Sequence, residues 1–263
     1  MKRFFTITCV TFLLYLISAG LFPHFFTVQE ALEQNAGAIL LSPSLTHLAG
    51  TDSLGRDQFA RLIEAGLVSL IISLAAAVIA LGIGILWGLL AGLGPARVET
   101  LLMHIVDILY AIPDLLLYIL MGLFLGRNLM GLVIALSSLS WLGIARLTRQ
   151  ESLKYKSMDY VTAAKALGVP NWQIAIKHIL PQMRDPLIVA MVFKIPALIA
   201  LESTLSFIGL GLAPPQASYG TLAKEGFDAY LVYPHLILFP LLFLFLTTFS
   251  FYAIGNALKR EQS

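Results

Sequence analysis

Residues 67–93 read LVSLIISLAAAVIALGIGILWGLLAGL, a run without a single charged side chain. A helix that crosses the hydrocarbon core of a bilayer needs about 20 consecutive apolar residues, so this run predicts a transmembrane helix. Its four glycines, spaced by two or four residues, are Gly82, Gly84, Gly88 and Gly92. Small residues at such spacing let helix backbones approach closely in lipid. The pair Gly94-Pro95 predicts where this helix ends.

The composition of the whole chain agrees with a membrane protein. Of 263 residues, 58% are hydrophobic and 12% are charged, about half the charged share of soluble domains. This composition excludes a water-soluble enzyme and a disordered chain. The net charge of +2 suggests no nucleic-acid partner. Cys9 is the single cysteine, so neither an internal disulfide nor a cysteine-based metal site is expected.

Six apolar runs predict an all-α polytopic membrane protein with six transmembrane helices. The runs cover residues 4–26, 67–93, 101–125, 129–147, 186–212 and 234–257. The first run has a rival interpretation as a cleaved signal peptide, but it continues past the weak cleavage candidate Ser18-Ala19-Gly20, which favours an uncleaved anchor. The expected divisions are an N-terminal transmembrane helix (1–26), an extracytoplasmic segment (27–66), a transmembrane core (67–258) and a cytoplasmic tail (259–263).

The distribution of Lys and Arg predicts the orientation in the membrane. With the N-terminus inside, twelve of the 17 Lys and Arg fall in inner segments, and Lys194 lies within the fifth span. The four in outer segments are Arg56, Arg61, Arg127 and Lys224. Inner loops of membrane proteins carry an excess of these residues, so both termini are expected in the cytoplasm.

A cytoplasmic segment, residues 159–181, has the pattern of two short helices. Asp159 is a plausible N-cap, and an apolar face follows at helical spacing: Tyr160, Ala163, Ala164 and Leu167. Gly168 occupies a position suited to a left-handed residue, and Pro170 cannot continue the helix. A second apolar face, Trp172, Ala175, Ile176 and Ile179, predicts a helix ending near Pro181. The pair either folds against the bundle's own end or docks a partner.

This segment resembles the EAA loop of ABC-importer permeases. The residues that carry the resemblance are DYVTAAKALG at 159–168, followed after a spacer by Leu180-Pro181. In that family the loop docks into a cleft on a cytoplasmic ATPase. The resemblance therefore implies a docking set of Tyr160, Ala163, Ala164, Leu167, Gly168, Leu180 and Pro181. The family's Glu falls on Thr162, where it could have closed a capping box with the N-cap, and its Ile falls on His178.

The outer segment contains HLAGTDSLGRDQFAR at 47–61. It resembles the Gly-Thr-Asp-x-x-Gly-Arg-Asp signature of permeases in the dipeptide, oligopeptide and nickel subfamily. We call its matching residues the outer motif: Gly50, Thr51, Asp52, Gly55, Arg56 and Asp57. The short polar side chains can cap turns, and the arginines, Arg61 included, can pair with the acids. Closure of the outer end of the bundle and contact with the solute both remain open as roles.

Two acids lie within the third predicted span. Asp107 and Asp114 are seven residues apart and so share a helix face. An acid in a membrane helix usually faces a cavity or a partner, so each is a pathway candidate; a hydrogen bond within the bundle is the alternative. The family has an Asp and a Pro at the positions of Asp107 and Pro113, but Asp114 has no such counterpart. Pro113 is expected to kink the helix.

The end of the fifth span, ESTLSFIGLG at 202–211, resembles a run in the same subfamily. Gly209 and Gly211, with Pro214-Pro215 behind them, predict the failure of regular helix. This places Glu202, Ser206 and both glycines among candidates for the outer mouth of a pathway. Glu202 is either a gate residue or, the slightly favoured interpretation, a hydrogen-bond partner between helices.

Together these resemblances imply the membrane subunit of an ATP-driven importer of peptides or a related small solute. They also imply that the chain is integral to the cytoplasmic (inner) membrane of a bacterial-type cell. They imply a related second permease, two cytoplasmic ABC ATPases and an extracytoplasmic solute-binding protein. The chain has no phosphate-binding loop motif, so ATP hydrolysis is expected in the ATPase subunits, with no catalytic residue, metal or cofactor here. One alternative is an ion-coupled secondary transporter using Asp107, Asp114 and Glu202. A membrane enzyme lacks any cluster at catalytic spacing.

Overall fold

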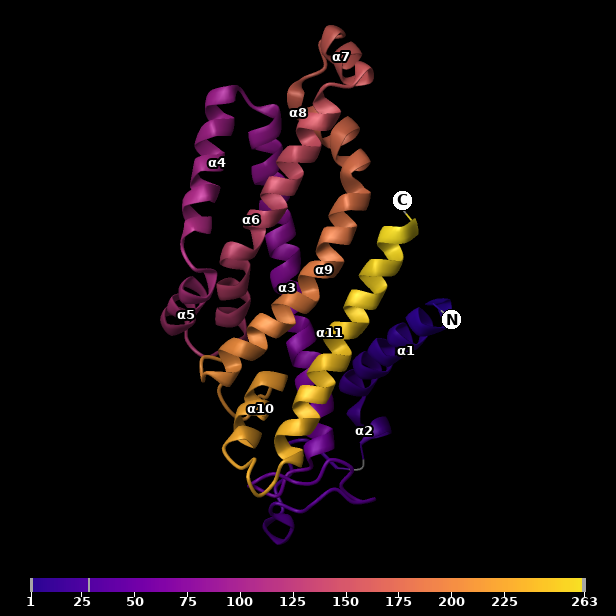
Figure 1. The fold of residues 1–263 in the computed structure, drawn as a ribbon, viewed down its shortest axis with the longest axis vertical. Coiled ribbons are helices and arrows are strands. Elements are labelled where there is room, and N and C mark those ends of the chain that lie inside the picture. Colours follow the sequence, from indigo (N-terminus) through magenta and orange to yellow (C-terminus); the bar gives the residue numbers. More distant parts are fainter. Residues whose placement is uncertain (1, 28, 262–263) are drawn as a thin grey trace.

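The computed structural model describes residues 2–27 and 29–261 of the chain as an elongated bundle of helices (Figure 1). Within these ranges no strand forms; Thr51 and Asp57 make an isolated antiparallel bridge. The all-α membrane fold expected from the sequence is therefore confirmed. We call the end that carries residues 29–57 the loop end and the opposite end, which carries α7 and α8, the coupling end (Figure 1).

The helices follow in simple order along the chain. They are α1 (Lys2–Leu21), α2 (Pro23–Phe26), α3 (Gln58–Leu93), α4 (Ala96–Ala111), α5 (Asp114–Leu125), α6 (Leu129–Lys156), α7 (Asp159–Ala166), α8 (Asn171–Ile174), α9 (Arg184–Phe207), α10 (Tyr219–Phe227) and α11 (His235–Glu261). A short 3₁₀ turn forms at Ala36–Ala38, and α8 is joined to α9 by a π-helical turn (Ala175–Ile179) and a 3₁₀ turn (Leu180–Met183).

Four helices of the described chain are long and apolar enough to cross a membrane. They are Gln58–Leu93, Leu129–Lys156, the continuous Asn171–Phe207 and His235–Arg260. The pair α4 and α5 makes a fifth if it is one span, but its halves meet at 87°. The apolar part of α1, Thr6–Leu21, is shorter than the others. The count of six spans thus stays a prediction.

The predicted kink at Pro113 is a full break of the third span. Helix α4 ends at Ala111, and α5 begins at Asp114 with Pro113 as its N-cap. Proline has no backbone N–H to donate and disfavours a helical conformation in the residue before it, so Ile112 is extended. We call this corner, residues 111–114, the elbow.

Glycines of α3 form the contact with α6, as the spacing predicts. A Cβ atom added to Gly84 would lie 2.6 Å from the Ile144 side chain, and one added to Gly92 would lie 2.6 Å from Ser152. Gly88 meets Thr148 in the same way, which makes a ladder with a period of four on both helices. Gly82 does not belong to it, because open space surrounds its Cβ position. The absence of side chains lets the two backbones pack closely in lipid.

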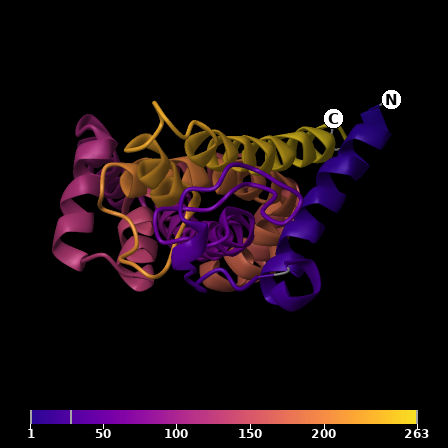
Figure 2. The same ribbon diagram turned by 90° about the horizontal axis from the view of Figure 1, so that it is seen from below.

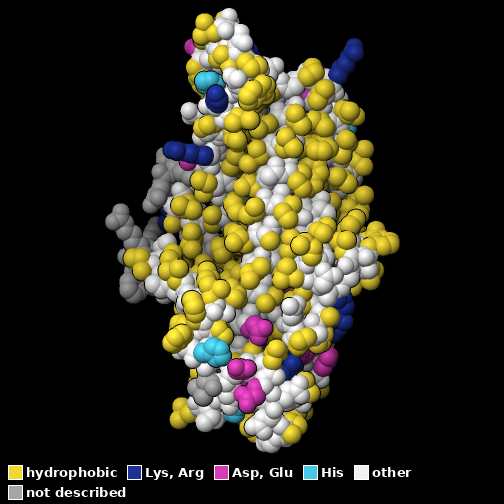
Figure 3. Space-filling model, turned by 180° about the vertical axis from the view of Figure 1, so that it is seen from behind, with side chains coloured by type: hydrophobic (Ala, Val, Ile, Leu, Met, Phe, Trp, Pro, Cys, Tyr) yellow, Lys and Arg dark blue, Asp and Glu magenta, His cyan; other side chains and the backbone are white. Residues whose placement is uncertain are grey.

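The surface has an apolar belt between two polar ends. Figure 3 shows hydrophobic side chains over most of the length, with most of the visible acidic side chains at the loop end and histidines at both ends. In Figure 2 the chain of the loop end covers the end of α3, while α1 and α5 lie on opposite sides of the bundle. This distribution fits a protein whose middle lies in hydrocarbon.

Several predicted boundaries differ from the structure, and two of them separate the expected divisions of the chain. Helix α3 begins at Gln58 rather than near Leu67, so its first turns belong to the expected outer segment. Its 36 residues span about 54 Å at 1.5 Å per residue, well beyond an apolar core of about 30 Å. Helix α11 continues to Glu261 into the expected tail, whose residues 262–263 lie outside the description.

Candidate functional site

We call residues 159–181, the predicted docking segment, the coupling segment. Its first helix, α7, projects beyond the ends of the long helices at one tip of the molecule (Figure 1). Helix α7 begins at Asp159 after the N-cap Met158, and no side chain caps it. The expected N-cap role of Asp159 is therefore wrong. Thr162 is consequently the fourth helical residue, and its hydroxyl donates to the Met158 carbonyl at 3.4 Å. The capping-box argument about this position does not hold in this geometry.

Gly168 ends α7 in the left-handed conformation expected of it. Its φ is +80°, and its amide donates to the Lys165 carbonyl at 2.9 Å. The next amide, of Val169, donates to the Ala164 carbonyl at 3.1 Å. These two bonds make a Schellman motif, which satisfies the last carbonyls of the helix. The position has room for a Cβ, so the requirement is conformational and not steric.

The predicted apolar face of α7 is divided between the core and the surface. Val161 is fully buried and Ala164 nearly so, in a cluster that includes Ile174 and Ile179. Tyr160 and Ala163 are exposed, and Leu167 is 84% exposed. Ala164 therefore packs in the core beneath α7, whereas the side chains of Tyr160, Ala163 and Leu167 are exposed at the surface.

The second predicted helix does not end at Pro181. It continues from Asn171 through the π-helical turn into α9 as one helix reaching Phe207. A proline lacks the amide that an α-helix would require, and the local π and 3₁₀ turns accommodate Pro181 without breaking the rod. Leu180 packs against the cluster around Val161, while Pro181 is exposed.

Two apolar side chains of the second helix are exposed as well, and they line a groove with leucines near the end of α3. Trp172 is 62% exposed, and Ile176 in the following turn is 56% exposed. Their predicted partners Ala175 and Ile179 face the core instead. We call Tyr160, Ala163, Leu167, Trp172 and Ile176 the coupling surface. Exposed large apolar groups gathered at a tip of a molecule mark an interaction site.

The outer motif forms a buried polar cluster at the loop end. The Asp52 carboxylate accepts from the backbone amides of Leu54 and Arg56 at 2.8 and 3.0 Å. Its second oxygen accepts from Arg56 Nε at 2.7 Å and from Arg61 Nη1 at 2.6 Å. Both arginines are at most 7% exposed. A carboxylate with this many donors is a fixed structural anchor.

The other residues of the outer motif complete this cluster. Asp57 is the N-cap of α3, accepting from the Ala60 amide at 2.8 Å, and it pairs with His47 at 2.9 Å. Thr51 accepts from the Leu41 amide and donates to the Ala38 carbonyl. Gly50 and Gly55 have positive φ angles of 77° and 72°. Each of these contacts ties the loop to itself or to α3, which favours a structural role over contact with the solute.

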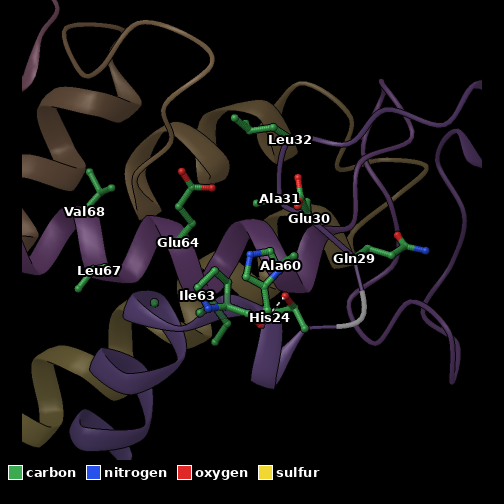
Figure 4. Close-up of a pocket in the computed structure, with 13 residues that line it drawn as sticks. His24, Gln29, Glu30, Ala31, Leu32, Ala60, Ile63, Glu64, Leu67 and Val68 are labelled. Atoms are coloured by element: carbon green, nitrogen blue, oxygen red, sulfur yellow. Dashed lines mark hydrogen bonds between the residues drawn. The ribbon is translucent and has the colours of Figure 1, made fainter.

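A pocket of about 580 Å³ lies near this cluster, between α1, α2 and α3. Figure 4 shows His24 of α2, Glu30 of the following loop and Glu64 of α3 in its lining. Among the described side chains no three His, Cys, Asp or Glu lie close enough to hold a metal ion. Because α1 and α5 lie on opposite sides of the bundle (Figure 2), this pocket is separate from the elbow.

Helices α4 and α6 carry half-exposed ion pairs. Arg146 Nη2 donates to Asp107 at 2.6 Å, and both side chains are about half exposed. The same guanidinium lies 4.0 Å above the Tyr110 ring. One step nearer the coupling end, Arg149 pairs with Glu99. Asp107 thus has a partner within the bundle and still borders an open face, which we call the charged wall: Glu99, Asp107, Tyr110, Arg146 and Arg149.

Glu202 is not part of an open face. It is fully buried, and the hydroxyls of Ser206 and Ser69 donate to it at 2.5 and 3.1 Å. Ser218, the N-cap of α10, extends the network by donating to Ser206 at 3.2 Å. The carboxyl group therefore joins α9, α3 and α10, and this geometry favours the interhelix interpretation over the gate.

The end of α9 has the same C-terminal motif as the end of α7 at Gly168. Gly209 has φ +93°, its amide donates to the Ser206 carbonyl, and the Leu210 amide donates to the Leu205 carbonyl. This is a second Schellman motif. Gly211 lies so close that an added Cβ would overlap Ser206. Regular helix fails here as the glycines predict, because α9 ends at Phe207.

Residues 84–262 match the family of binding-protein-dependent transport system inner membrane components. The chain belongs to this family. This permease is 38% identical over 217 residues to the oligopeptide transport system permease protein OppC of Bacillus subtilis, covering 82% of this chain and 71% of the relative.

Further comparisons agree with the family. The dipeptide transport system permease protein DppC of Bacillus subtilis is 36% identical over 249 residues, covering 94% of the permease and 76% of the relative. Among solved structures, an inward-facing MetNI methionine ABC transporter matches with a TM-score of 0.66 at 18% identity, over 78% of this chain and 97% of that one. The solved structure supports the fold, whereas the curated relatives support membership among transport permeases.

Several residues of the permease site escaped the sequence interpretation. Glu225 pairs with Arg61 across 164 positions, a separation that no local pattern can reveal. Arg146 was counted only as an inner charge, although it is the partner of Asp107. Lys194 could have been identified from the sequence, because a charged side chain within an apolar span is costly and usually has a functional role.

Proposed function

We propose that this permease is one of two related membrane subunits of an ATP-driven peptide importer. Two cytoplasmic ATPases bind its coupling surface and the equivalent surface of its partner, and a solute-binding protein delivers the solute at the loop end. The coupling end faces the cytoplasm of the cell, in agreement with the excess of Lys and Arg in the segments assigned there. The chain itself carries out no hydrolysis, and lipid surrounds its apolar belt.

The observation that carries this proposal is that exposed apolar side chains of the coupling surface lie on the same helix as a predicted membrane span. Trp172 and Ile176 lie on the same continuous helix that crosses the membrane to Phe207. A displacement applied to Trp172 and Ile176 is therefore transmitted to α9 without passing through a loop. This is the mechanical requirement for an ATPase to drive a membrane helix from outside the bilayer.

The pathway is assigned to the face that includes the charged wall and the elbow. Half-exposed charges such as Asp107 and Arg146 are costly against lipid and are tolerated beside water or protein. A broken helix such as the α4–α5 pair is tolerated at membrane depth under the same condition. This face is therefore the one that contacts the second permease and the solute, with Asp107, Pro113 and Asp114 along it.

Peptides are the proposed solutes because relatives at 36–38% identity are named for oligopeptide and dipeptide transport. The ion-coupled alternative finds no support among the relatives. Of the three acids on which this alternative depends, Glu202 has a structural role, because it is buried among hydroxyl groups away from any open face.

Purification of the tagged permease from its native membranes in mild detergent tests this function. We expect a second permease and a P-loop ATPase to co-purify, and the complex to hydrolyse ATP. Reconstituted with its binding protein, it should accumulate labelled tri-alanine when ATP is supplied. A permease that purifies alone, or that accumulates the peptide on a proton gradient without ATP, would contradict the proposal.

A further inference from the structure

The elbow borders a partly open cavity with charges of both signs. It has a volume of about 430 Å³ and lies between the end of α4, the start of α5 and the facing sides of α6 and α9. Asp114 and Lys194 line it together with the rings of Tyr110 and Tyr118, and leucines of α6 form the apolar wall. Its size is within the range of about 300–1,000 Å³ that small-molecule sites occupy.

Lys194 lines this cavity, and no contact within the described part of the bundle accounts for its charge. It lies ten residues into α9 and is half buried. Within the described part of the chain its ammonium makes no hydrogen bond and no ion pair. A lysine within a membrane helix is costly and normally pairs with an anion or a carbonyl. A cation that lines a cavity without such a pair is available to an anion of a ligand.

Asp114 supplies the opposite charge in the same cavity. It interacts electrostatically with Lys194, but the two side chains form no ion pair. The only hydrogen bond of its carboxylate in the described chain comes from the adjacent Leu115 amide at 2.8 Å. The C-terminal carbonyls of α4 add negative partial charge on the same side, because the elbow interrupts the helix before they can be paired.

The arrangement meets a general requirement for binding a dipolar solute at membrane depth. Broken helices in transporters direct their ends at charged groups of the solute. Here the break, an acid and an unpaired cation border one cavity, and the charges remain separated rather than neutralising each other. Tyr118, whose hydroxyl lies 3.2 Å from that of Ser140, adds a polar group to the wall between them.

From this geometry we infer that the elbow cavity binds the transported solute as a zwitterion, with its ammonium beside Asp114 and its carboxylate beside Lys194. The inference rests on the proposed peptide importer and specifies which ends of the peptide this subunit recognises. Selection at this cavity is separate from selection by the binding protein, because the cavity belongs to the permease itself.

The test measures binding to the assembled transporter in nanodiscs, without binding protein and without nucleotide. The probes are tri-alanine, its N-acetyl form and its C-terminal amide. We expect the wild type to bind each blocked form at least about tenfold more weakly than tri-alanine, the factor that corresponds to about 1.4 kcal/mol. Lys194→Met should bind tri-alanine and its amide equally, and Asp114→Asn should bind tri-alanine and its N-acetyl form equally.

Matched controls separate recognition from loss of structure. Lys194→Arg keeps the cation and should keep the preference for the free carboxylate. Lys224→Met and Asp228→Asn remove the same charges from exposed positions of α10 and its C-cap and should leave the wild-type pattern. A uniform loss of affinity for all three probes in the Lys194 and Asp114 variants would assign these residues a structural role and overturn the inference.

Failure of the inference and failure of the proposed function have different signatures. Equal binding of all three probes by a wild-type complex that still imports tri-alanine with ATP would overturn the inference alone. Absence of measurable tri-alanine binding to that active complex would do the same. Loss of the ATPase from the purified sample, with no ATP-driven uptake, would overturn the function on which the inference rests.

Discussion

The guanidinium of Arg61 joins two acids that lie far apart in the sequence. Its Nη1 atom donates to Asp52 and to Glu225, each at 2.6 Å, and Nη2 donates again to Glu225 at 3.2 Å. Asp52 belongs to the loop before α3, and Glu225 belongs to α10. One buried side chain at the start of α3 thus holds together the elements of the loop end, which explains how a segment without regular structure keeps a defined shape.

Replacing Arg61 is expected to destabilise the permease severely. Arg61→Met leaves the buried Asp52 with one cation instead of two and Glu225 without its main partner. Removal of one partner of a buried ion pair costs about 3–5 kcal/mol. Thermal unfolding of the detergent-solubilised protein should show a clearly lowered melting temperature. Glu225→Gln should have a smaller effect, because the Glu225 side chain is 45% exposed; an equal or larger loss in this variant would contradict the account.

The glycine ladder of α3 predicts a contrast between two glycines of one helix. Gly88→Val should prevent the close contact of α3 with Thr148 of α6 and should reduce the yield of folded protein. Gly82→Val introduces the same side chain where no atom lies within 4 Å, and it should fold normally. Size-exclusion chromatography after mild extraction distinguishes the two. Equal behaviour of the variants would refute the assigned packing.

Leu167 is expected to matter for ATPase binding and not for folding. Leu167→Asp places a charge on a side chain that is 84% exposed, so the melting temperature should remain unchanged. If the coupling surface is the ATPase site, the loss of a central apolar contact should weaken co-purification of the ATPase by at least about tenfold, as for a typical interface hot spot. Leu45→Asp is the matched control, because Leu45 is 98% exposed at the loop end. Retention of the ATPase by Leu167→Asp would remove this residue from the interface.

Gly168 is expected to act through the backbone of the coupling segment. At φ +80° a residue with a Cβ adds about 1–2 kcal/mol of strain, while no neighbouring atom obstructs it. Gly168→Val should therefore insert and fold in the membrane but lose the ATPase on purification. Gly168→Asn should retain more of it, because asparagine tolerates the left-handed conformation better. The reverse order of the two variants would show that side-chain volume, and not backbone conformation, is the determining property.

The orientation of the chain can be tested with single cysteines in a Cys9→Ser background. Leu45→Cys should react with an impermeant thiol reagent added outside intact cells, whereas Lys165→Cys should react only after permeabilisation. Both positions are exposed. Gly50, although it lies in the same outer segment, is unsuitable because it is buried with φ +77° and its Cβ position meets the Leu41 carbonyl. The opposite labelling pattern would reverse the proposed topology.

Local sequence determined the helices, their breaks and the family of this protein. Apolar runs report directly on burial in lipid, Gly168 and Gly209 mark left-handed helix ends, and Pro113 marks the elbow, because each of these properties depends on a few neighbouring residues. Gly84, Gly88 and Gly92 indicated a close helix contact for the same reason. The family motifs are equally local, and they identified the permease before any partner of those residues was known.

Tertiary structure alone decided which polar groups meet and which side of a short helix faces the core. The pairing of Arg61 with Glu225, the burial of Glu202 among serines and the division of α7 between Ala164 and Leu167 depend on elements distant in the chain. The same holds for Lys194 and Asp114, which share a cavity only because the 87° elbow places the start of α5 near α9. Electrostatic and packing contacts are set by distance in space, which a linear pattern does not contain.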